Sequence, residues 1–276
     1  MIKKDYLKML NNLEQGEESV KPGQHDRVIF VDGLNLFLRN FAVLNFVNSS
    51  GNHIGGLAGF LRSLGALINQ IQPTTMYVVF DGVGASTNRR YLLPEYKSGR
   101  HTNRITNWDA FDDIDEENNS KVDQITRLIQ YLKCLPVKVV SIDKLEADDI
   151  IAYMSKDMAK RFDTKSYIVS SDKDLMQLVD HNTLLFDPMK QLWVDDVKVY
   201  EKFGVPPKKV IDVQSLAGDS SDNIPGVPGI GIKTAAELIN EYGSLDELLL
   251  RTAEIKQNKR RENLIEYADQ ARLSRS

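Results

Sequence analysis

Cysteine is nearly absent from this sequence, and so are long apolar runs. Cys134 is the single cysteine among 276 residues, which excludes an intrachain disulfide and is typical of a reducing cytoplasm. No apolar stretch approaches the roughly 18 residues that cross a membrane, and the polar N-terminus lacks the apolar region of a signal peptide. With 42% hydrophobic and 27% charged residues and no internal repeats, the composition is that of a soluble globular protein.

An excess of positive charge, common in nucleic-acid-binding proteins, is also missing, since the formal net charge is −4. This sum conceals a concentration of acids, because nine of them lie at the ends of predicted apolar elements. Without these nine, the rest of the chain would carry a net charge of +5. A cluster that bound divalent cations would offset much of the difference, so the overall charge does not exclude a nucleic-acid partner.

Three carboxylates are packed into four positions of the stretch Lys-Leu-Glu-Ala-Asp-Asp-Ile-Ile-Ala-Tyr at residues 144–153. On a helix, Glu146 and Asp149 share a face while Asp148 points to one side. Asp143 with Glu146 also fits a capping box, so these acids could instead begin a helix. A cap needs one or two acids, however, and three crowded like charges destabilise one another unless a cation neutralises them. The pattern therefore favours metal binding over capping.

Further acids follow four other predicted elements. An acid just past a buried strand, repeated along the chain, describes the carboxyl edge of a parallel sheet, where open α/β sheets bind their ligands. Single members could cap a helix or begin a turn, but five such coincidences are hard to reconcile with capping alone. These acids are Asp32 and Asp81 at the ends of apolar runs, Asp172 and Asp174 after residues 167–171, and Asp219 and Asp222 in Ala-Gly-Asp-Ser-Ser-Asp-Asn.

Strand-like and helix-like segments alternate through residues 25–206, which predicts an α/β region with a mostly parallel sheet covered on both faces by helices. The expected strands are 28–31, 76–80, 137–142, 166–169 and a short pair at 183–186 and 191–194. The expected helices are 34–46, 57–71, 122–135, one from the Glu146 motif to about 162, and one around 174–179. Residues 1–24 form a separate N-terminal extension. Residues 207–276 are purely helical, with helices expected at 208–217, 234–242, 245–251 and 254–273.

Carboxylate ligands without Cys or clustered His suit hard cations such as Mg²⁺ or Mn²⁺ rather than zinc. Mg²⁺ binds few carboxylates, keeps several waters and takes further ligands from substrate phosphates. Nine acids allow two ions roughly 4 Å apart, one of which activates water while both stabilise the transition state and the leaving oxygen. Phosphodiester hydrolysis is the reaction that such a site serves.

A glycine-rich turn, Ile-Pro-Gly-Val-Pro-Gly-Ile-Gly-Ile-Lys-Thr-Ala-Ala from residue 224, joins two predicted helices. Its three glycines can take positive φ, which leaves backbone N–H groups and a helix N-terminus facing outward to bind a phosphate. This pattern predicts a helix–hairpin–helix element that follows the backbone of duplex DNA without reading bases. A plain Gly/Pro turn would explain only one or two of the glycines. The DNA-binding candidates are Gly226, Gly229, Gly231, Lys233 and Thr234.

A basic segment with interleaved tyrosines follows the Asp81 strand. Lys97 and Arg100 lie at a Pro-Glu-Tyr-Lys turn, from which they could reach the scissile phosphate and neutralise developing charge. Tyr96 could stack on a terminal base, although a half-buried tyrosine is equally common. The flanking arginines fit a solvated face as well as a DNA contact. They are Arg89, Arg90 and Arg104.

Six ordered motifs between about residues 28 and 245 resemble the 5′ nuclease (flap endonuclease) family, which includes the exonuclease domain of bacterial DNA polymerase I and phage 5′ exonucleases, some called RNase H. Members of this type often continue past the position of Ser276, so we expect either a longer protein or a second chain that completes it. The motifs are Val-Asp-Gly-Leu-Asn, Phe-Asp-Gly, Leu-Pro-Glu-Tyr-Lys-x-x-Arg, Glu-Ala-Asp-Asp, Ser-Ser-Asp-Lys-Asp, and Gly-Asp-Ser-Ser-Asp-Asn-Ile-Pro-Gly-Val-Pro-Gly-Ile-Gly-x-Lys-Thr.

The resemblance implies structure-specific hydrolysis of DNA flaps and RNA primers from 5′ ends during replication, in a bacterial or phage-infected cell. It implies a PIN/5′-nuclease-like sheet, a helical arch at about residues 85–120 with Lys97 and Arg100 as its basic pair, and a C-terminal helix–hairpin–helix (H3TH) subdomain where K⁺ can mediate a phosphate contact. By motif match, the first metal site would comprise Asp32, Asp81, Glu146, Asp148 and Asp172. The second would comprise Asp174, Asp219 and Asp222, with Asp172 as a shared candidate and Asp149 as the ninth acid.

The expected partners are branched or 5′-ended DNA and RNA–DNA hybrids, with a replicative polymerase or single-strand-binding protein as further candidates, and a monomeric chain. Two alternatives stay open. A PIN-type ribonuclease shares the acidic sheet edge, but the glycine hairpin and the Asp219–Asp222 pair disfavour it. A non-catalytic duplex-DNA-binding module would use the acids only as caps, which does not account for nine of them.

Overall fold

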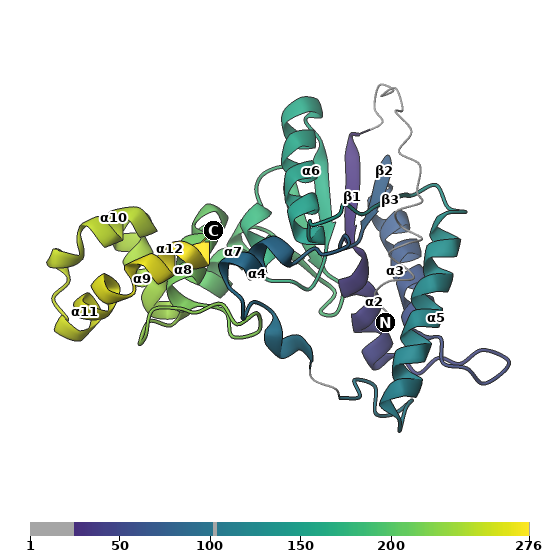
Figure 1. The fold of residues 1–276 in the computed structure, drawn as a ribbon. Helices are drawn as coiled ribbons and strands as arrows, with labels where there is room; N and C mark the ends of the chain where they lie inside the picture. The colour runs from purple at the N-terminus through teal and green to yellow at the C-terminus, as the bar shows by residue number, and fades with distance from the viewer. Residues whose placement is uncertain (1–24, 102–103, 276) are drawn as a thin grey trace. The chain divides into compact units, whose positions relative to one another are not determined.

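The computed structural model describes residues 25–101 and 104–275, so the predicted N-terminal extension lies outside the described residues (Figure 1). The described chain divides into two units. The sheet unit comprises residues 25–86, 104–172 and 181–193. The helical unit comprises residues 87–101, 173–180 and 194–275. The predicted α/β region therefore contributes to both units.

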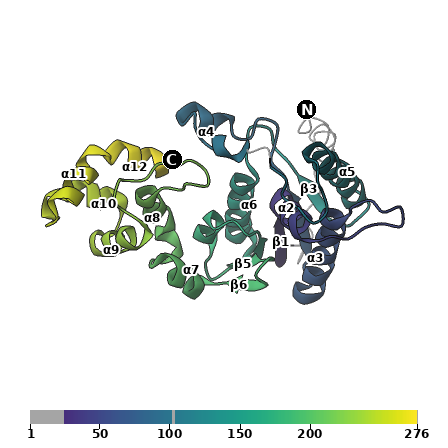
Figure 2. The same ribbon diagram turned by 90° about the horizontal axis from the view of Figure 1, so that it is seen from below.

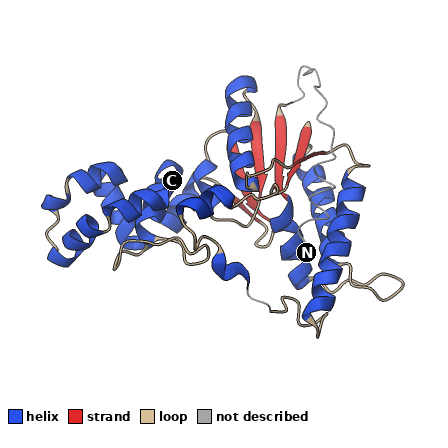
Figure 3. Ribbon diagram, viewed as in Figure 1, coloured by secondary structure: helices blue, strands red, loops and turns tan. Residues whose placement is uncertain are grey.

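Six strands form one sheet in the order β3-β2-β1-β4-β5-β6, coloured red in Figure 3. The neighbouring pairs from β3 to β5 are all parallel. The chain passes from β1 to β2 and β3 and then returns to β4 on the other side of β1, so the strand order reverses between β1 and β4. Open α/β sheets bind ligands beyond the carboxyl ends of the strands at such a reversal. The strands are β1 (Arg27–Asp32), β2 (Thr75–Val79), β3 (Lys138–Val140), β4 (Lys165–Val169), β5 (Thr183–Asp187) and β6 (Leu192–Val194).

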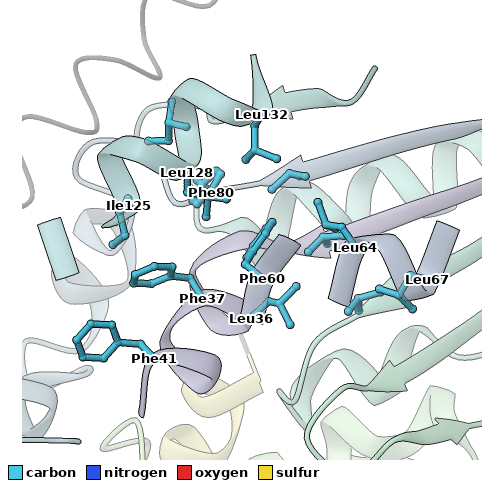
Figure 4. Packing of buried hydrophobic residues seen from close by; sticks show 14 of the residues in the cluster. Leu36, Phe37, Phe41, Phe60, Leu64, Leu67, Phe80, Ile125, Leu128 and Leu132 are labelled. Carbon is cyan, nitrogen blue, oxygen red and sulfur yellow. The ribbon is translucent and has the colours of Figure 1, made fainter. Parts of the chain in front are cut away.

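One face of the sheet packs against α2 (Gly33–Val43), α3 (Gly55–Ile71) and α5 (Ile114–Leu132) (Figures 1 and 2). Alternate residues of a strand point to the same face, and Ile29 pairs in register with Met76 on this side. The aromatic and aliphatic side chains that fill this layer are fully or almost fully buried. Those labelled in Figure 4 are Leu36, Phe37, Phe41, Phe60, Leu64, Leu67, Phe80, Ile125, Leu128 and Leu132.

The opposite face, where the rings of Phe30 and Tyr77 stack at 5.5 Å, is covered by α6 (Ala147–Phe162) (Figure 1). Helix α6 has acids in its first turn and Lys160 and Arg161 in its last turn, an arrangement that the helix dipole stabilises at both ends. Sheet and helices therefore form three layers, with the carboxyl ends of β1, β2 and β4 left at one edge. Together with the order of the strands, this confirms the predicted fold class.

The helical unit is built from short helices. Its longest member, α9, buries Ala235, Leu238 and Ile239 on one face. Within the described residues, no helix of either unit is long and apolar enough to cross a membrane. The elements are α4 (Thr87–Leu92), η1 (Ser98–His101), η2 (Asp174–Leu178), α7 (Asp196–Phe203), η3 (Pro207–Lys209), α8 (Val210–Ala217), α9 (Ile232–Tyr242), α10 (Leu245–Leu250), η4 (Thr252–Glu254), α11 (Asn258–Glu266) and α12 (Ala268–Arg275).

Several element boundaries differ from the predicted ones. Helix α5 begins at Ile114 rather than 122, because Asp113 caps it by accepting a hydrogen bond from the Glu116 backbone N–H at 2.8 Å. The predicted helix 254–273 is divided at Tyr267 into α11 and α12, and the segment after Lys173 is a 3₁₀ helix. Helices α4 and α7 were not predicted.

Candidate metal centre and nucleic-acid interface

Asp32 lies at the end of β1 and caps helix α2. One carboxylate oxygen accepts the Asn35 backbone N–H at 3.1 Å, and the other accepts the Ser170 hydroxyl at 3.0 Å. Ser170 follows β4, and its own oxygen accepts the backbone N–H of Asp172 at 3.0 Å. The side chain of Asp32 is 7% exposed. The ends of β1 and β4 are thus joined through one buried hydroxyl, which brings Asp32 and Asp172 into the same neighbourhood.

Asp81 follows β2 and contacts the start of α6. Its Oδ1 accepts the backbone N–H of Ala147 at 2.8 Å, one of the first N–H groups of that helix. Negative charge is favoured at a helix N-terminus, so this hydrogen bond holds the Asp81 carboxylate in place against the helix. The carboxylate that caps α6 therefore comes from a different strand and not from the local sequence.

The glycine after each of these aspartates is required by close packing. A Cβ at Gly33 would lie 2.7 Å from the ring of Phe80, and a Cβ at Gly82 would lie 1.8 Å from the carbonyl oxygen of Ile142. Real Cβ atoms do not approach so closely, so only glycine lets β1, β2 and the loop before α6 converge. Each Asp-Gly pair in the sequence therefore supplies an acid and also the glycine that lets the neighbouring segments pack closely beside that acid.

The environment of Asp32 raises its pKa to about 7. Burial is the largest cause, and the nearby charges of Asp81 and Asp172 raise the pKa further, while the hydrogen bonds from Asn35 and Ser170 oppose the shift. The carboxylates that follow β2 and β4 therefore each repel the charge of Asp32 at the sheet edge. A divalent cation would relieve this repulsion.

Glu146 is 3% exposed and lies at the N-cap position of α6, but its side chain does not cap the helix. Its Oε1 accepts the hydroxyl of Ser86 at 2.8 Å. Asp143, the other half of the predicted capping box, accepts the Val83 backbone N–H at 3.3 Å instead. The capping-box alternative is therefore wrong. Asp148 and Asp149 lie in the first turn of α6 and are partly exposed.

The remaining acids, Asp174, Asp219 and Asp222, belong to the helical unit. Asp219 is 7% exposed and pairs with the ammonium group of Lys173 at 2.9 Å. Burial opposes ionisation of Asp219, but hydrogen bonds from Ser221 and Lys173 outweigh it and lower the pKa of this carboxyl. Asp222 is 5% exposed. Asp174 accepts the side-chain amide of Gln214 at 2.5 Å.

As placed, no three His, Cys, Asp or Glu side chains within residues 25–101 and 104–275 converge closely enough to ligate one ion together. The chemistry of the acids nevertheless fits a hard cation. Mg²⁺ is held by one or two carboxylates and keeps several waters, and the raised pKa of Asp32 shows that Asp81 and Asp172 lie within electrostatic reach of it. Asp32 paired with Asp81 or with Asp172 could hold such an ion, with water as its other ligands.

Three polar residues at this edge were not among the predicted site residues. Ser170 links Asp32 to Asp172, and the Asn35 side chain accepts the Ser171 backbone N–H at 3.1 Å. Asp187 at the end of β5 accepts the Ser171 hydroxyl and pairs with the Lys190 ammonium. Burial raises the pKa of this carboxyl, but its hydrogen bonds outweigh burial, so the pKa is lowered. Asn35 stands in the Val-Asp-Gly-Leu-Asn motif and could have been found there.

The glycine hairpin is formed, but its glycines act differently from one another. Only Gly229 has positive φ, at 77°. Gly231 is extended and precedes α9 as its N-cap without a side-chain hydrogen bond. Gly226 is needed because a Cβ there would lie 2.4 Å from the backbone of Ala217. Of the three glycines that could take positive φ, one does so, and the start of α9, which includes Lys233 and Thr234, is accessible as expected for this motif.

The basic segment is organised around Tyr96, which is 6% exposed. The Lys97 ammonium lies 4.9 Å from the centre of its ring and the Arg89 guanidinium lies 5.9 Å from it. Arg90 donates to the Tyr96 carbonyl at 3.3 Å. The ring therefore holds the cations in place, and its burial does not favour the predicted stacking on a base. Arg104 is exposed, and the Arg100 side chain lies outside the described residues.

Comparison with known families matches both parts of the chain. Residues 27–204 match the family described as 5'-3' exonuclease, N-terminal resolvase-like domain, and residues 205–276 match the 5'-3' exonuclease, C-terminal SAM fold. The 5'-3' exonuclease of Aquifex aeolicus is 36% identical over 79% of this chain and 71% of its own length. DNA polymerase I of Rhizobium leguminosarum is 38% identical over 93% of this chain. The chain spans 24% of the length of that polymerase.

Solved structures share the fold. The bacteriophage T5 flap endonuclease, in a complex with DNA and metal ions, has a TM-score of 0.74 at 22% identity, covering 90% of this chain and 87% of that one. The catalytic core of Rad2 with a DNA substrate has a TM-score of 0.51 at 18% identity, covering 88% of this chain and 72% of that one. At these identities the likeness establishes the architecture alone.

The raised pKa of Asp32, caused by burial and by the neighbouring charges, predicts that stability depends on pH. Because the pKa of Asp32 is about 7 in the folded chain and 3.8 in a model peptide, the free energy of unfolding should fall as pH rises from about 4 to 7. Asp32→Asn removes this charge, so in EDTA it should stabilise the protein relative to wild type more at pH 8 than at pH 5, by about 2 kcal/mol. Urea denaturation at both pH values measures the difference. An equal effect at pH 5 and pH 8 would contradict the shifted pKa.

The hairpin predicts a contrast between two glycines. Gly226→Ala should lower the free energy of unfolding by about 2 kcal/mol, because the added methyl overlaps the Ala217 backbone. Gly231→Ala should be tolerated, because a Cβ there meets nothing within 4 Å and φ is −92°. Urea denaturation of both variants provides the measurement. Equal losses would show that the close approach at Gly226 is not what requires glycine.

Proposed function

Because this chain belongs to the 5'-3' exonuclease family, we propose that it hydrolyses phosphodiester bonds near the 5′ ends of DNA at the acidic edge of its sheet. The observation that carries the proposal is the set of three strand-end carboxylates around Asp32, whose pKa is raised by burial and further by the charges of Asp81 and Asp172. Such a site is stable with its acids ionised only when cations are present, and a nucleic-acid phosphate brings its own negative charge to the same cations.

The proposed cofactor is Mg²⁺ or Mn²⁺, as two ions. When bound, such ions activate a water and stabilise the charge that develops on the phosphate. Two of Asp32, Asp81 and Asp172 would bind the first ion directly, and the third, with Glu146 and Asp148, would complete its surroundings. Ser170 and Asn35 would orient these carboxylates through their hydrogen bonds. The acids proposed for the second ion are Asp174, Asp219 and Asp222, and the Lys173 ammonium pairs with Asp219 beside them at 2.9 Å.

The substrate phosphate would be engaged by two further elements. Lys97 carries a positive charge on the turn before η1, where it can stabilise negative charge on the scissile phosphate. The start of α9 presents backbone N–H groups that no side chain caps, with Lys233 beside them, and would bind the phosphate backbone of the duplex. A K⁺ ion is proposed to mediate this second contact.

The proposed substrates are DNA flaps, 5′-ended duplexes and RNA–DNA hybrids, as arise during replication in the cytoplasm. A direct test uses the purified protein with an end-labelled flap, a blunt duplex, an RNA–DNA hybrid and single-stranded RNA, each with Mg²⁺ or EDTA. Cleavage of the flap near its 5′ end in Mg²⁺ and not in EDTA supports the proposal. Cleavage of single-stranded RNA alone would favour a PIN-type ribonuclease, and binding without cleavage would favour a non-catalytic module.

The metal assignment predicts a separation of binding from cleavage. Asp172→Asn should abolish flap cleavage, because it removes a charged ligand, yet leave DNA binding within about twofold of wild type, because it removes no contact with the duplex. Single-turnover cleavage and fluorescence anisotropy measure the two properties. Cleavage at the wild-type rate would remove Asp172 from the site.

The role of Lys97 predicts a loss of rate and not of affinity. Lys97→Met keeps the aliphatic stem and the left-handed backbone cost of a non-glycine residue but removes the ammonium group. Single-turnover cleavage at saturating DNA should slow by more than about tenfold, as the loss of a transition-state contact requires. A weaker affinity with an unchanged rate would instead assign Lys97 to substrate capture.

A further inference from the structure

The turn that carries Lys97 is joined to the loop that carries Asp219 and Asp222, and both lie in the helical unit. The Lys97 backbone N–H donates to the carbonyl of Asp222 at 2.8 Å. The side-chain amide of Asn223 donates to the Ser98 hydroxyl at 2.8 Å and to the Glu95 carbonyl at 3.2 Å. One asparagine thus contacts the turn on both sides of Lys97. We call these three hydrogen bonds the Asn223 latch.

Both sides of the latch have unusual backbone conformations. Lys97 has φ of +56° and Asn223 has φ of +55°. Asparagine tolerates this left-handed region, but a lysine in it costs on the order of 1 kcal/mol, so the surrounding contacts must offset that cost. Burial of Tyr96 and the latch are the contacts that do so. The direction in which the Lys97 side chain points therefore depends on the hydrogen bonds that Asn223 makes with this turn.

The loop on the other side of the latch is itself rigid. Asp219 and Ile224 exchange two backbone hydrogen bonds, each of 2.8 Å, which close the loop around residues 220–223. The Asp219 carboxylate also accepts the Ser221 backbone N–H and hydroxyl at 2.9 and 2.6 Å. Because Asn223 stands on this closed loop and binds the turn at residues 95–98, the turn is held at a fixed place relative to Asp219 and Asp222.

We propose that Asn223 is a positioning residue for catalysis, which sets Lys97 at a fixed place relative to Asp219 and Asp222. This inference rests on the proposed nuclease function of Lys97 and of these acids. In this role Asn223 touches neither the substrate nor an ion. Its loss lets the turn at residues 95–99 leave its left-handed conformation, so that the ammonium no longer meets the phosphate as charge develops on it. A small misplacement of this kind is enough to slow the chemical step.

The test is a double-mutant cycle on the full chain. Asn223→Gly removes the amide but keeps the freedom to take positive φ, so it isolates the hydrogen bonds from backbone strain. Ser98→Ala removes one of the same hydrogen bonds from the other side. Gln72→Gly, at the left-handed end of α3, is the matched control for glycine at a positive-φ position. The cycle is completed by Lys97→Met alone and by Lys97→Met combined with Asn223→Gly. For every variant we would measure single-turnover flap cleavage in Mg²⁺, DNA affinity in EDTA and thermal stability.

If the latch positions Lys97, Asn223→Gly slows cleavage at saturating DNA by about tenfold, with affinity unchanged, and Ser98→Ala slows it by less. Asn223→Gly then adds nothing in the Lys97→Met background, because there is no ammonium left to place. Gln72→Gly cleaves at the wild-type rate.

Three results would overturn the inference: a wild-type rate for Asn223→Gly, a wild-type rate for Lys97→Met, or an equal loss from Asn223→Gly whether or not the ammonium is present. If Asn223→Gly does not fold, Ser98→Ala in the same cycle decides between these outcomes. A wild-type chain that cleaves none of the DNA substrates is a different result, because it refutes the proposed function itself.

Discussion

The fold brings together negative charges that repel one another. Asp32, Asp81 and Asp172 follow three parallel strands on either side of the reversal in strand order, and Asp32 is buried, which raises the cost of its charge. The protein offsets part of this cost with dipoles and hydrogen bonds, from the first turn of α6 and from Ser170. In the helical unit it uses a full charge, that of Lys173 beside Asp219. The two groups of acids are thus stabilised by different means.

Much of this arrangement could be predicted from the sequence because strand ends are encoded locally. An apolar run followed by Asp-Gly marks both the end of a strand and a tight approach, and the structure shows the collision that each glycine avoids. Asp187 shows the limit of the same pattern. It also ends a strand, but Ser171 and Lys190 occupy its oxygens, so it fixes a loop instead of presenting a charge. Only the neighbouring side chains distinguish these roles.

Contacts between distant segments could not be predicted, because the hydrophobic periodicity of a sequence indicates local helices and strands and not which of them touch. The sequence offers local capping by Asp143 and Glu146 only as the alternative to metal binding, and it gives no sign that Asp81 from another strand caps this helix. Segment 87–101 lies within the predicted α/β region and clusters with the helical unit, where the Asn223 amide donates to the Glu95 carbonyl across more than a hundred residues of chain. The sequence also does not distinguish the three hairpin glycines. Gly229 forms a left-handed turn, Gly226 allows a close approach to Ala217, and Gly231 precedes α9 without capping it.

The two units share the chain in an interleaved manner, since residues 87–101 and 173–180 leave the sheet unit and return to it. The family boundary between residues 204 and 205 is therefore not a place where the protein can be divided. A fragment that begins there would lack Lys173, the salt-bridge partner of Asp219, and the whole turn on which Asn223 acts. Exchange of the helical unit during evolution would have to carry along residues 87–101 and 173–180, which stand within the sequence of the sheet unit, and this ties the two units of the chain to a common history.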